Sequence, residues 1–290
     1  MKTENYHLEF LTPCFCAGAI QSSAEVRAPS IRGKLRWWFR LLGGSAEQEG
    51  ELFGSVRGEM GAASSIMVRV SEATLAAKWQ PIQFSGISNT GYILYFAKAS
   101  ASGARWVAGG AIPQGAKFSL IVSWRRSVSS DAQAIFDLAL KCFLMLGSLG
   151  LRSTRGLGAF ECEELPFNAA AFKTLVSEIK MRSPIFHSGL GQFAGSEAQW
   201  LDGLGAQLRG LRKGYTAGPP GRSNPTPLGS SSKPRQASAV YLRPVRDSGT
   251  ARIVVFEAPA QKILGCESRR GAPRLGNGVS PPGDPPQRHR

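Results

Sequence analysis

Alternating apolar and polar residues predict several short strands along the chain. In the first part of the sequence the strand candidates are residues 6–11, 65–70, 91–97, 117–124 and 159–165. Two more, residues 239–244 and 252–257, follow closer to the C-terminus. These runs are short and separated by glycine, proline and polar residues, which is typical of strands joined by turns.

Apolar residues at helical spacing predict four helices. The first opens with Pro29 and Ser30, where Ser30 is a candidate N-cap, and it ends at Gly43 and Gly44. The second covers residues 131–147 and has a broad apolar face. Residues 169–182 and 197–211 are less regular helix candidates.

The order of these elements predicts an α+β fold. Residues 1–165 follow the order β, α, two or more strands, α, β, which fits a ferredoxin-like or RRM-like sandwich with insertions. Residues 166–264 form a second, less regular region, in which 214–238 are rich in Gly, Pro and Ser and indicate an extended loop. The basic tail, residues 265–290, has few apolar residues and is predicted to be disordered.

Charge indicates the class of partner. The 290 residues include 35 Lys and Arg against 20 Asp and Glu, a formal net charge of +15, with a pI near 10.1. A polyanion is the expected partner, with nucleic acid first and an anionic membrane surface second. The N-terminus lacks a signal-peptide core and no apolar run is long enough to span a bilayer, so we expect a soluble cytoplasmic protein.

Cysteine and histidine give no metal-site pattern. The five Cys are scattered, Cys14 and Cys16 lack the usual zinc-knuckle spacing, and the three His are far apart in sequence. We therefore expect reduced thiols, no metal and no other cofactor.

One long segment is basic without any acid. Between Gly203 and Arg246 no Asp or Glu occurs. The basic residues there are Arg209, Arg212, Lys213, Arg222, Lys233, Arg235, Arg243 and Arg246. The bias is either an accident of a solvated loop or a surface that contacts phosphates, and we favour the second interpretation.

The first predicted helix carries an arginine ridge. Arg32, Arg36 and Arg40 recur every four residues, on a different face from the apolar residues of the helix. Like charges at this spacing repel, and no acid is interleaved to relieve the repulsion. An ordinary solvated face is one interpretation; an anionic ligand along the ridge is the one we favour.

A glycine-rich loop, GLRSTRGLGAF (150–160), is the third basic element. Gly150, Gly156 and Gly158 permit close backbone approach, and Arg152 and Arg155 supply guanidinium groups for phosphate oxygens. The loop runs from a helix to a strand, so it is a poor fit to a Walker or Rossmann phosphate loop.

Five segments together resemble the RAMP superfamily of CRISPR-Cas proteins, most closely the first subunit of the type III-B Cmr effector module. They are FLTPCFCAGA (10–19), EVRAPSIRGKLRWWFRLL (25–42), ELFGS (51–55), IPQGAKFSL (112–120) and GLRSTRGLGAF (150–160), with a weaker echo in 224–245. The resemblance spans most of residues 6–258.

The resemblance implies two ferredoxin-like domains, the second degenerate, in a non-catalytic RNA-binding subunit. Such a subunit caps an RNA-guided, RNA-targeting complex and holds the 3′ region of the guide RNA, the target RNA or both, beside other RAMP subunits. The candidate RNA-binding residues are Arg27, Arg32, Lys34, Arg36, Arg40, Arg152 and Arg155, to which the acid-free segment adds Arg209, Arg212, Lys213 and Arg235. We expect Trp37 and Trp38 to be packing anchors instead of base-stacking platforms.

Catalysis is not expected. The related subunit that cuts target RNA uses a loop Asp and a divalent metal, whereas no acid occurs here from Val26 to Ala46. His187 is the one weak candidate for metal-independent acid–base chemistry, and His7 is expected to be structural. Two alternatives stay open: a metal-independent RAMP endoribonuclease that processes guide-RNA precursors, and a protein scaffold without direct RNA contact.

Overall fold

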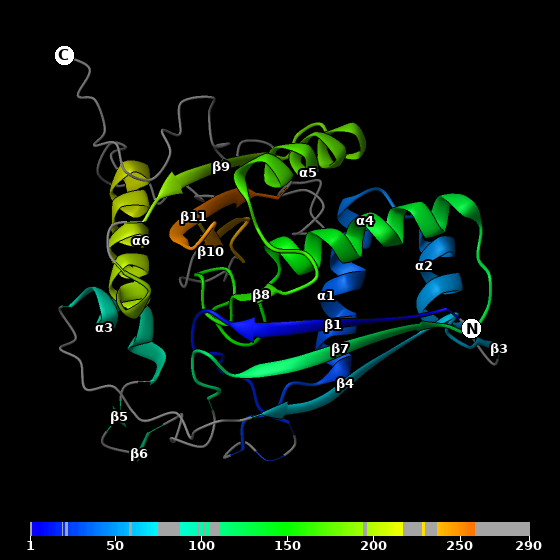
Figure 1. Cartoon of the computed structure of the whole chain (residues 1–290), viewed down its shortest axis with the longest axis horizontal. Helices are drawn as coiled ribbons and strands as arrows, with labels where there is room; N and C mark the ends of the chain where they lie inside the picture. The colour runs from blue at the N-terminus through cyan, green and yellow to red at the C-terminus, as the bar shows by residue number, and fades with distance from the viewer. Residues whose placement is uncertain are drawn as a thin grey trace.

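The computed structural model describes residues 2–18, 20, 23–57, 60–74, 88–97, 99–100, 103–104, 111–193, 196–216, 228–229 and 237–258. Within these residues the protein is α+β, as predicted, and its larger sheets are antiparallel (Figure 1). The predicted tail, residues 265–290, lies outside the described residues.

The helices and strands follow one another in two groups. The first group comprises β1 (Thr3–Phe10), α1 (Ala28–Leu41), α2 (Ala46–Phe53), β2 (Ser55–Arg57), β3 (Met60–Ala62), β4 (Ile66–Thr74), α3 (Asn89–Leu94), the 3₁₀ turn η1 (Tyr95–Ala97), β5 (Ala99–Ser100), β6 (Gly103–Ala104), β7 (Lys117–Trp124), α4 (Ser130–Leu146) and β8 (Phe160–Cys162). The second comprises α5 (Ala169–Arg182), β9 (His187–Gln192), the 3₁₀ turn η3 (Glu197–Gln199), α6 (Trp200–Thr216), β10 (Val240–Asp247) and β11 (Thr250–Glu257).

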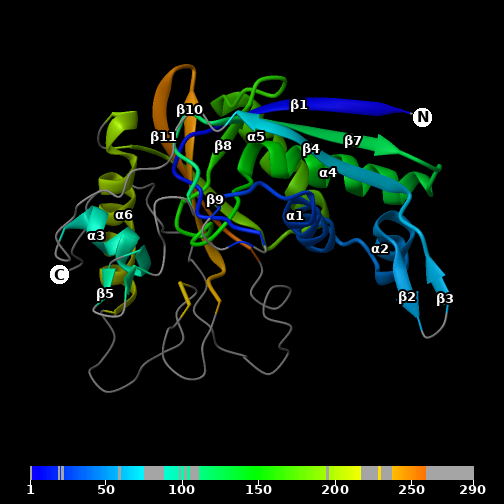
Figure 2. The same ribbon diagram turned by 90° about the horizontal axis from the view of Figure 1, so that it is seen from below.

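The first sheet has the strand order of a ferredoxin-like fold. Its order is β4-β7-β1-β8, every neighbouring pair is antiparallel, and α1 and α4 are the two crossover helices. Figure 2 shows both helices on the same face of the sheet. Alternate residues of β1 and β7, such as Leu8 and Leu120, point into the layer between sheet and helices and are buried there.

The second sheet, in the order β10-β11-β9, is also antiparallel. The succession β9, α6, β10, β11 repeats the first strand, helix and next two strands of a ferredoxin-like unit. The two sheets share one apolar core, in which Trp38 of α1 packs against Phe256 of β11 at 5.7 Å between ring centroids. The domain boundary at residue 165 stays a prediction.

Most predicted elements are present, but several differ, and the short strands β2, β3, β5 and β6 were not predicted. Residues 91–97 form α3 and η1 instead of a strand, because Ser88 caps the helix by accepting a hydrogen bond from the Gly91 amide. Helix α1 starts at Ala28 with Arg27 at the N-cap, so Ser30 lies in the first turn and its proposed capping role is wrong. Helix α2 and strand β9 were not predicted; glycines at 189 and 191 conceal the strand pattern of β9.

Two arginines of the α1 ridge form ion pairs with an acid on α2. Glu49 is buried, and its carboxylate accepts hydrogen bonds from Arg36 at 2.6 Å and from Arg40 at 2.5 and 2.6 Å. Arg32 donates to the carbonyl oxygen of Phe53 at the C-terminal end of α2. An acid distant in sequence therefore relieves the repulsion, and the ridge does not require the anionic ligand that the sequence favoured.

The glycine-rich loop is held by backbone contacts to the segment that follows β1. The Gly158 amide donates to the Pro13 carbonyl at 2.9 Å, and the Leu151 amide donates to the Phe15 carbonyl at 2.8 Å. Gly150 and Gly158 both have positive φ, +77° and +64°. A Cβ at position 150 would lie 2.5 Å from the Phe15 carbonyl oxygen, so the loop can approach the segment after β1 this closely only because residue 150 is glycine.

We expect Gly158→Ala to lower the free energy of unfolding by about 2–4 kcal/mol, because it adds left-handed strain and a clash with the Leu149 carbonyl oxygen. Chemical denaturation measures this. Gly189→Ala in β9 is the matched control, since an added Cβ meets no atom within 4 Å there. Equal effects of the two substitutions would contradict the packing described for the loop.

We expect Glu49→Gln to lower the free energy of unfolding by about 1–2 kcal/mol at neutral pH, because it weakens the charged hydrogen bonds from Arg36 and Arg40, whose guanidinium groups are partly solvated. The hydrogen bond from Arg40 and the other arginine interactions hold the pKa of Glu49 below its ordinary value. The stability that Glu49 contributes is thus present above the ordinary Glu pKa, about 4.3, and is lost as pH falls through the lowered folded-state pKa. The penalty of Glu49→Gln should shrink under acid, whereas exposed Glu47→Gln should have little effect at any pH.

Candidate nucleic-acid interface

Arginines from the glycine-rich loop and from α6 converge on aromatic rings of α3 and η1. The Arg152 guanidinium lies 5.4 Å from the centre of the Phe96 ring. Arg209 and Arg212 lie 5.0 and 5.6 Å from the centre of the Tyr92 ring. We call Arg152, Arg155, Arg209 and Arg212 the arginine cluster. It brings together the glycine-rich loop and the acid-free segment, which are distant in sequence.

Burial and like charge both disfavour the protonated form of the loop arginines. Desolvation lowers the pKa of Arg152, and the charge of Arg212 lowers it further. Burial lowers the pKa of Arg155 to about 10, with contributions from Arg212 and Arg152. Within the described part of the chain, Arg152 and Arg155 make no ion pair with a carboxylate. Such a concentration of like charge favours an anion.

Arg155 has an unsatisfied donor in this region. One of its terminal nitrogens donates to the Leu228 carbonyl, but the other, Nη1, is buried and has no hydrogen-bond partner among the described residues. A buried guanidinium with an unpaired N–H is costly, and an acceptor oxygen from a ligand or water would relieve that cost.

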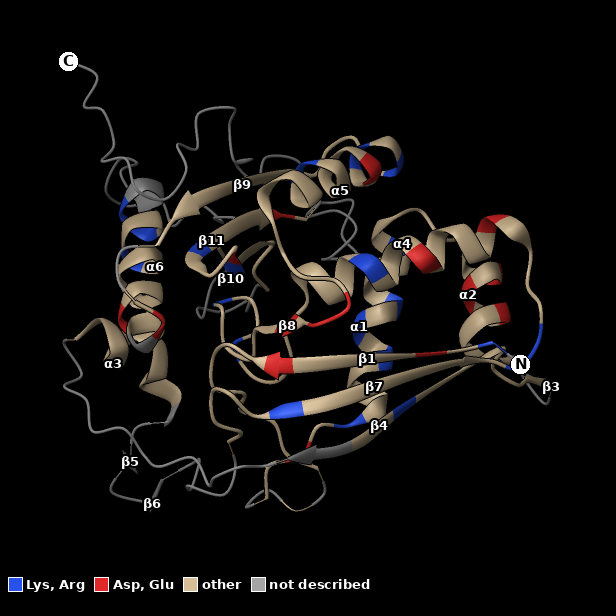
Figure 3. Cartoon of the chain, in the orientation of Figure 1, with Lys and Arg blue, Asp and Glu red and all other residues tan. Residues whose placement is uncertain are grey.

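The α1 residues fall into two sets. Arg32, Arg36 and Arg40 are engaged with α2, and Figure 3 shows basic positions on α1 and acidic positions on α2. Arg27 is exposed at the N-cap. Lys34 points toward the glycine-rich loop, where its Nζ donates to the Ser153 hydroxyl at 3.0 Å, and burial lowers its pKa.

Beside Lys34 lies an open pocket of about 340 Å³ between α1 and the second sheet. Its lining residues are Ser30, Gly33, Lys34, Trp37, Trp38, Leu146, Gly147, Ser148, Tyr241 and Phe256. The sequence pattern did not single out Tyr241 and Phe256, because nothing in a strand sequence reveals that it will face a helix 200 residues earlier.

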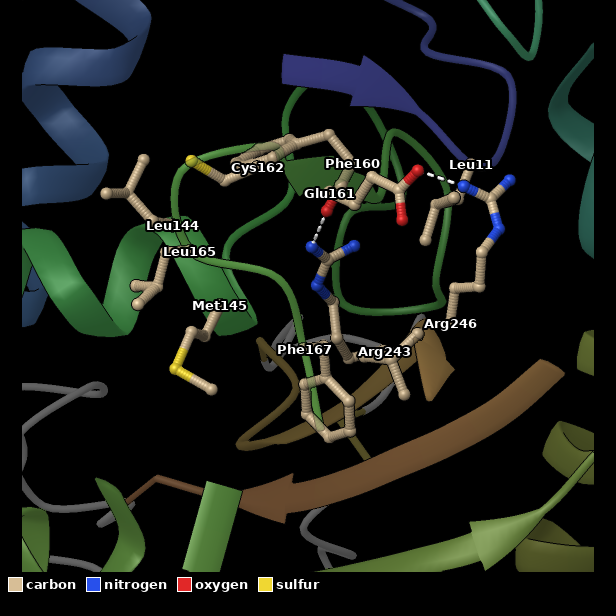
Figure 4. A pocket seen from close by; sticks show the side chains of 11 residues that line it. Leu11, Leu144, Met145, Phe160, Glu161, Cys162, Leu165, Phe167, Arg243 and Arg246 are labelled. Carbon is tan, nitrogen blue, oxygen red and sulfur yellow. Dashed lines mark hydrogen bonds and ion pairs between the residues drawn. The ribbon is translucent and has the colours of Figure 1, made fainter. Parts of the chain in front are cut away.

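Two arginines of the acid-free segment have structural partners. Arg243 of β10 is fully buried, donates to the Phe160 carbonyl and lies 5.1 Å from the centre of the Phe160 ring (Figure 4). Arg246 pairs with Glu161 and Glu197. These side chains join the second sheet to β8, so the interpretation of the whole segment as a phosphate-contacting loop is wrong at these positions.

The other basic residues of the acid-free segment lie on α6 or outside the described residues. Lys213 is exposed in the last turns of α6, close in sequence to Arg209 and Arg212. Arg222, Lys233 and Arg235 lie outside the described residues.

The two histidines among the described residues, His7 and His187, lie in different strands. His187 lies in β9, in register with Glu257 of β11. His7 is about half exposed, and its Nδ1 is hydrogen-bonded to Glu164. Among the described residues, no three His, Cys, Asp or Glu side chains are grouped as metal ligands, and Cys14, Cys16, Cys142 and Cys162 are free thiols.

None of the helices in the described ranges is both long and apolar enough to cross a membrane.

Curated relatives share sequence with part of the chain. The CRISPR system Cmr subunit Cmr1-1 of Pyrococcus furiosus is 29% identical over 171 residues, which cover 56% of this chain and 48% of that protein. Subunit Cmr1-2 of the same organism is 39% identical over 61 residues, 18% of this chain and 33% of that protein. The chain thus spans about half the length of Cmr1-1 and a third of Cmr1-2.

Solved structures share the fold over most of the chain. The crystal structure of Cmr1 from Pyrococcus furiosus in its apo form superposes with a TM-score of 0.59 at 20% identity, covering 89% of this chain and 88% of that one. A chain in the cryo-EM structure of the type III-B Cmr-beta complex bound to cognate target RNA gives a TM-score of 0.53 at 12% identity, covering 88% and 94%. At these identities the likeness establishes the fold.

The family is established by a match over a defined part of the sequence. The model of the RAMP superfamily matches residues 7–161, more than half of the chain, from β1 through the glycine-rich loop to β8. The match includes the ferredoxin-like sheet, α1 and the loop that carries Arg152 and Arg155. The chain therefore belongs to the RAMP superfamily.

Proposed function

We propose that this chain is an RNA-binding subunit of a type III-B CRISPR effector complex. The observation that carries the proposal is the arginine cluster, in which four guanidinium groups gather beside Tyr92 and Phe96 and a buried Arg155 N–H has no hydrogen-bond partner among the described residues. Like charges held this close repel one another, and a bound anion would relieve that repulsion. The relatives named as Cmr subunits, and the likeness to a chain of a complex with target RNA, support RNA as that anion.

The mechanism is recognition of the backbone. Arginine guanidinium groups bind phosphate oxygens in pairs, and each phosphate that they neutralise releases counterions. The glycine-rich loop holds Arg152 and Arg155 at fixed positions, and α6 adds Arg209 and Arg212 from the second region. Sequence is then read by base pairing between RNAs and not by this cluster.

Within the complex, the chain is proposed to cap one end. It would hold the 3′ region of the guide RNA, the target RNA or both, and contact other RAMP subunits through surfaces away from the arginine cluster. We assign it no cleavage step: His7 and His187 lie in the separate strands β1 and β9, and the proposed role needs only phosphate binding.

We expect the triple variant Arg152→Gln, Arg209→Gln, Arg212→Gln to bind single-stranded RNA much more weakly than the unchanged protein. If each arginine neutralises one phosphate, the slope of log K against log salt concentration should become shallower by about 2. Fluorescence anisotropy with a labelled RNA over a salt series measures both quantities.

The control removes the same charge elsewhere. Lys173 and Lys180 of α5 and Arg125 after β7 are exposed, and their triple change to Gln should alter the slope little. If both triple variants lost RNA equally, binding would follow net charge and not the cluster. If the unchanged protein retained no RNA, the proposed function itself would be wrong.

A further inference from the structure

The pocket beside Lys34 has a wall made of aromatic rings from both regions of the chain. Trp37 of α1 lies 5.2 Å from Tyr241 of β10, and Tyr241 stacks on Phe256 of β11 at 4.8 Å with only 2° between the ring planes. Trp38 completes the wall against Phe256. Trp38 and Phe256 are buried, whereas Trp37 and Tyr241 are only partly buried and line the open space.

The polar groups of the pocket are nearly all donors or hydroxyls. Lys34 uses one hydrogen-bond donor on Ser153 and, in the described part of the protein, has no ion pair with an acid. The Ser148 hydroxyl donates to the Ser153 carbonyl at 3.0 Å, so its lone pairs remain as acceptors. Ser30, one turn before Lys34 on α1, adds a hydroxyl to the lining. A positive charge without a carboxylate favours a ligand edge that carries acceptor oxygens.

The pocket adjoins the arginine cluster through one residue. Ser153, which binds Lys34 and accepts from Ser148 through its carbonyl, directly follows Arg152 of the cluster. A ligand that has an anionic backbone next to a flat ring could therefore occupy both places at once. The pocket volume of about 340 Å³ lies in the range, roughly 300–1,000 Å³, in which small ligands bind.

We propose that this pocket takes one unpaired nucleobase of the bound RNA, stacked against Trp37 and Tyr241, and that it prefers a base with carbonyl oxygens, uracil or guanine, which Lys34 can contact. The inference rests on the proposed function, because the arginine cluster holds the adjoining phosphates. It gives Trp37 a second role beside the expected packing, which it makes against Trp38 and Tyr241. Base–aromatic stacking tolerates any base, and the ammonium of Lys34 supplies the preference.

The test compares RNAs that differ only in their bases. A 15-mer of uridine, a 15-mer of adenosine and a 15-mer of abasic ribose carry the same phosphates, so the arginine cluster should bind all three. The unchanged protein should bind the uridine 15-mer about 10-fold more tightly than the abasic one, and more tightly than the adenosine one. Anisotropy at one salt concentration gives the three affinities.

Two substitutions separate stacking from charge. Trp37→Ala should reduce the uridine-to-abasic ratio to about 1, while Trp37→Phe, which keeps a ring and the fold, should retain most of it. Lys34→Met should remove the preference for uridine over adenosine. Lys173→Met on exposed α5 is the matched control and should change neither ratio.

Photocrosslinking locates the base. An RNA that contains 4-thiouridine should crosslink to peptides with Trp37 or Tyr241. If the unchanged protein bound uridine and abasic RNA equally, and crosslinks formed elsewhere, the pocket proposal would be overturned while RNA binding stood. If neither RNA bound, the proposed function would fall, and the pocket proposal with it.

Discussion

Close backbone contact at two glycines is the constraint on which the rest of the molecule depends. The loop 150–158 lies against residues 13–15 so tightly that no Cβ fits at Gly150 or Gly158, and amide–carbonyl bonds hold it there. The Leu242 amide, from the second sheet, bonds to Thr154 of the same loop at 3.1 Å. The loop therefore ties β1, α4 and β10 together, and it fixes Arg152, Ser153 and Arg155 at the junction of the two sheets.

In the folded protein some basic residues are paired with acids, whereas others have no carboxylate partner among the described residues. Glu49 pairs with the α1 arginines, and Glu161 and Glu197 pair with Arg246, so these cations hold elements together. Arg152, Arg155 and Lys34 have no carboxylate partner in the residues that the structure describes. Arg152 and Arg155 belong to the glycine-rich loop, and Lys34 donates to Ser153 of the same loop. Net charge alone indicates a polyanion, whereas this distribution indicates where it binds.

Local pattern was enough to predict much of the fold, and contacts distant in sequence explain what it missed. Strand β7 and helix α5 have the predicted bounds, since apolar periodicity sets both. The ridge on α1 was misinterpreted because Glu49 lies in a helix that the pattern did not indicate. The glycine-rich loop and its arginines were recognisable as a motif, but their meeting with Tyr92 and Phe96 depends on α3 being a helix. The sequence pattern placed Tyr241 in a strand, but it could not show that this strand would line a pocket with α1.

Amide hydrogen exchange with and without single-stranded RNA tests the central claim most directly, because it reports on every segment of the unaltered chain. The account predicts protection on RNA binding at residues 150–158, in α6 around Arg209 and Arg212, and in α1 around Lys34 and Trp37, with β1 and β7 unchanged. Protection confined to the open face of the first sheet, formed by alternate residues of β1 and β7, would contradict it. RNA would then lie on the sheet, as in an RRM, and not along the junction that the glycine-rich loop creates.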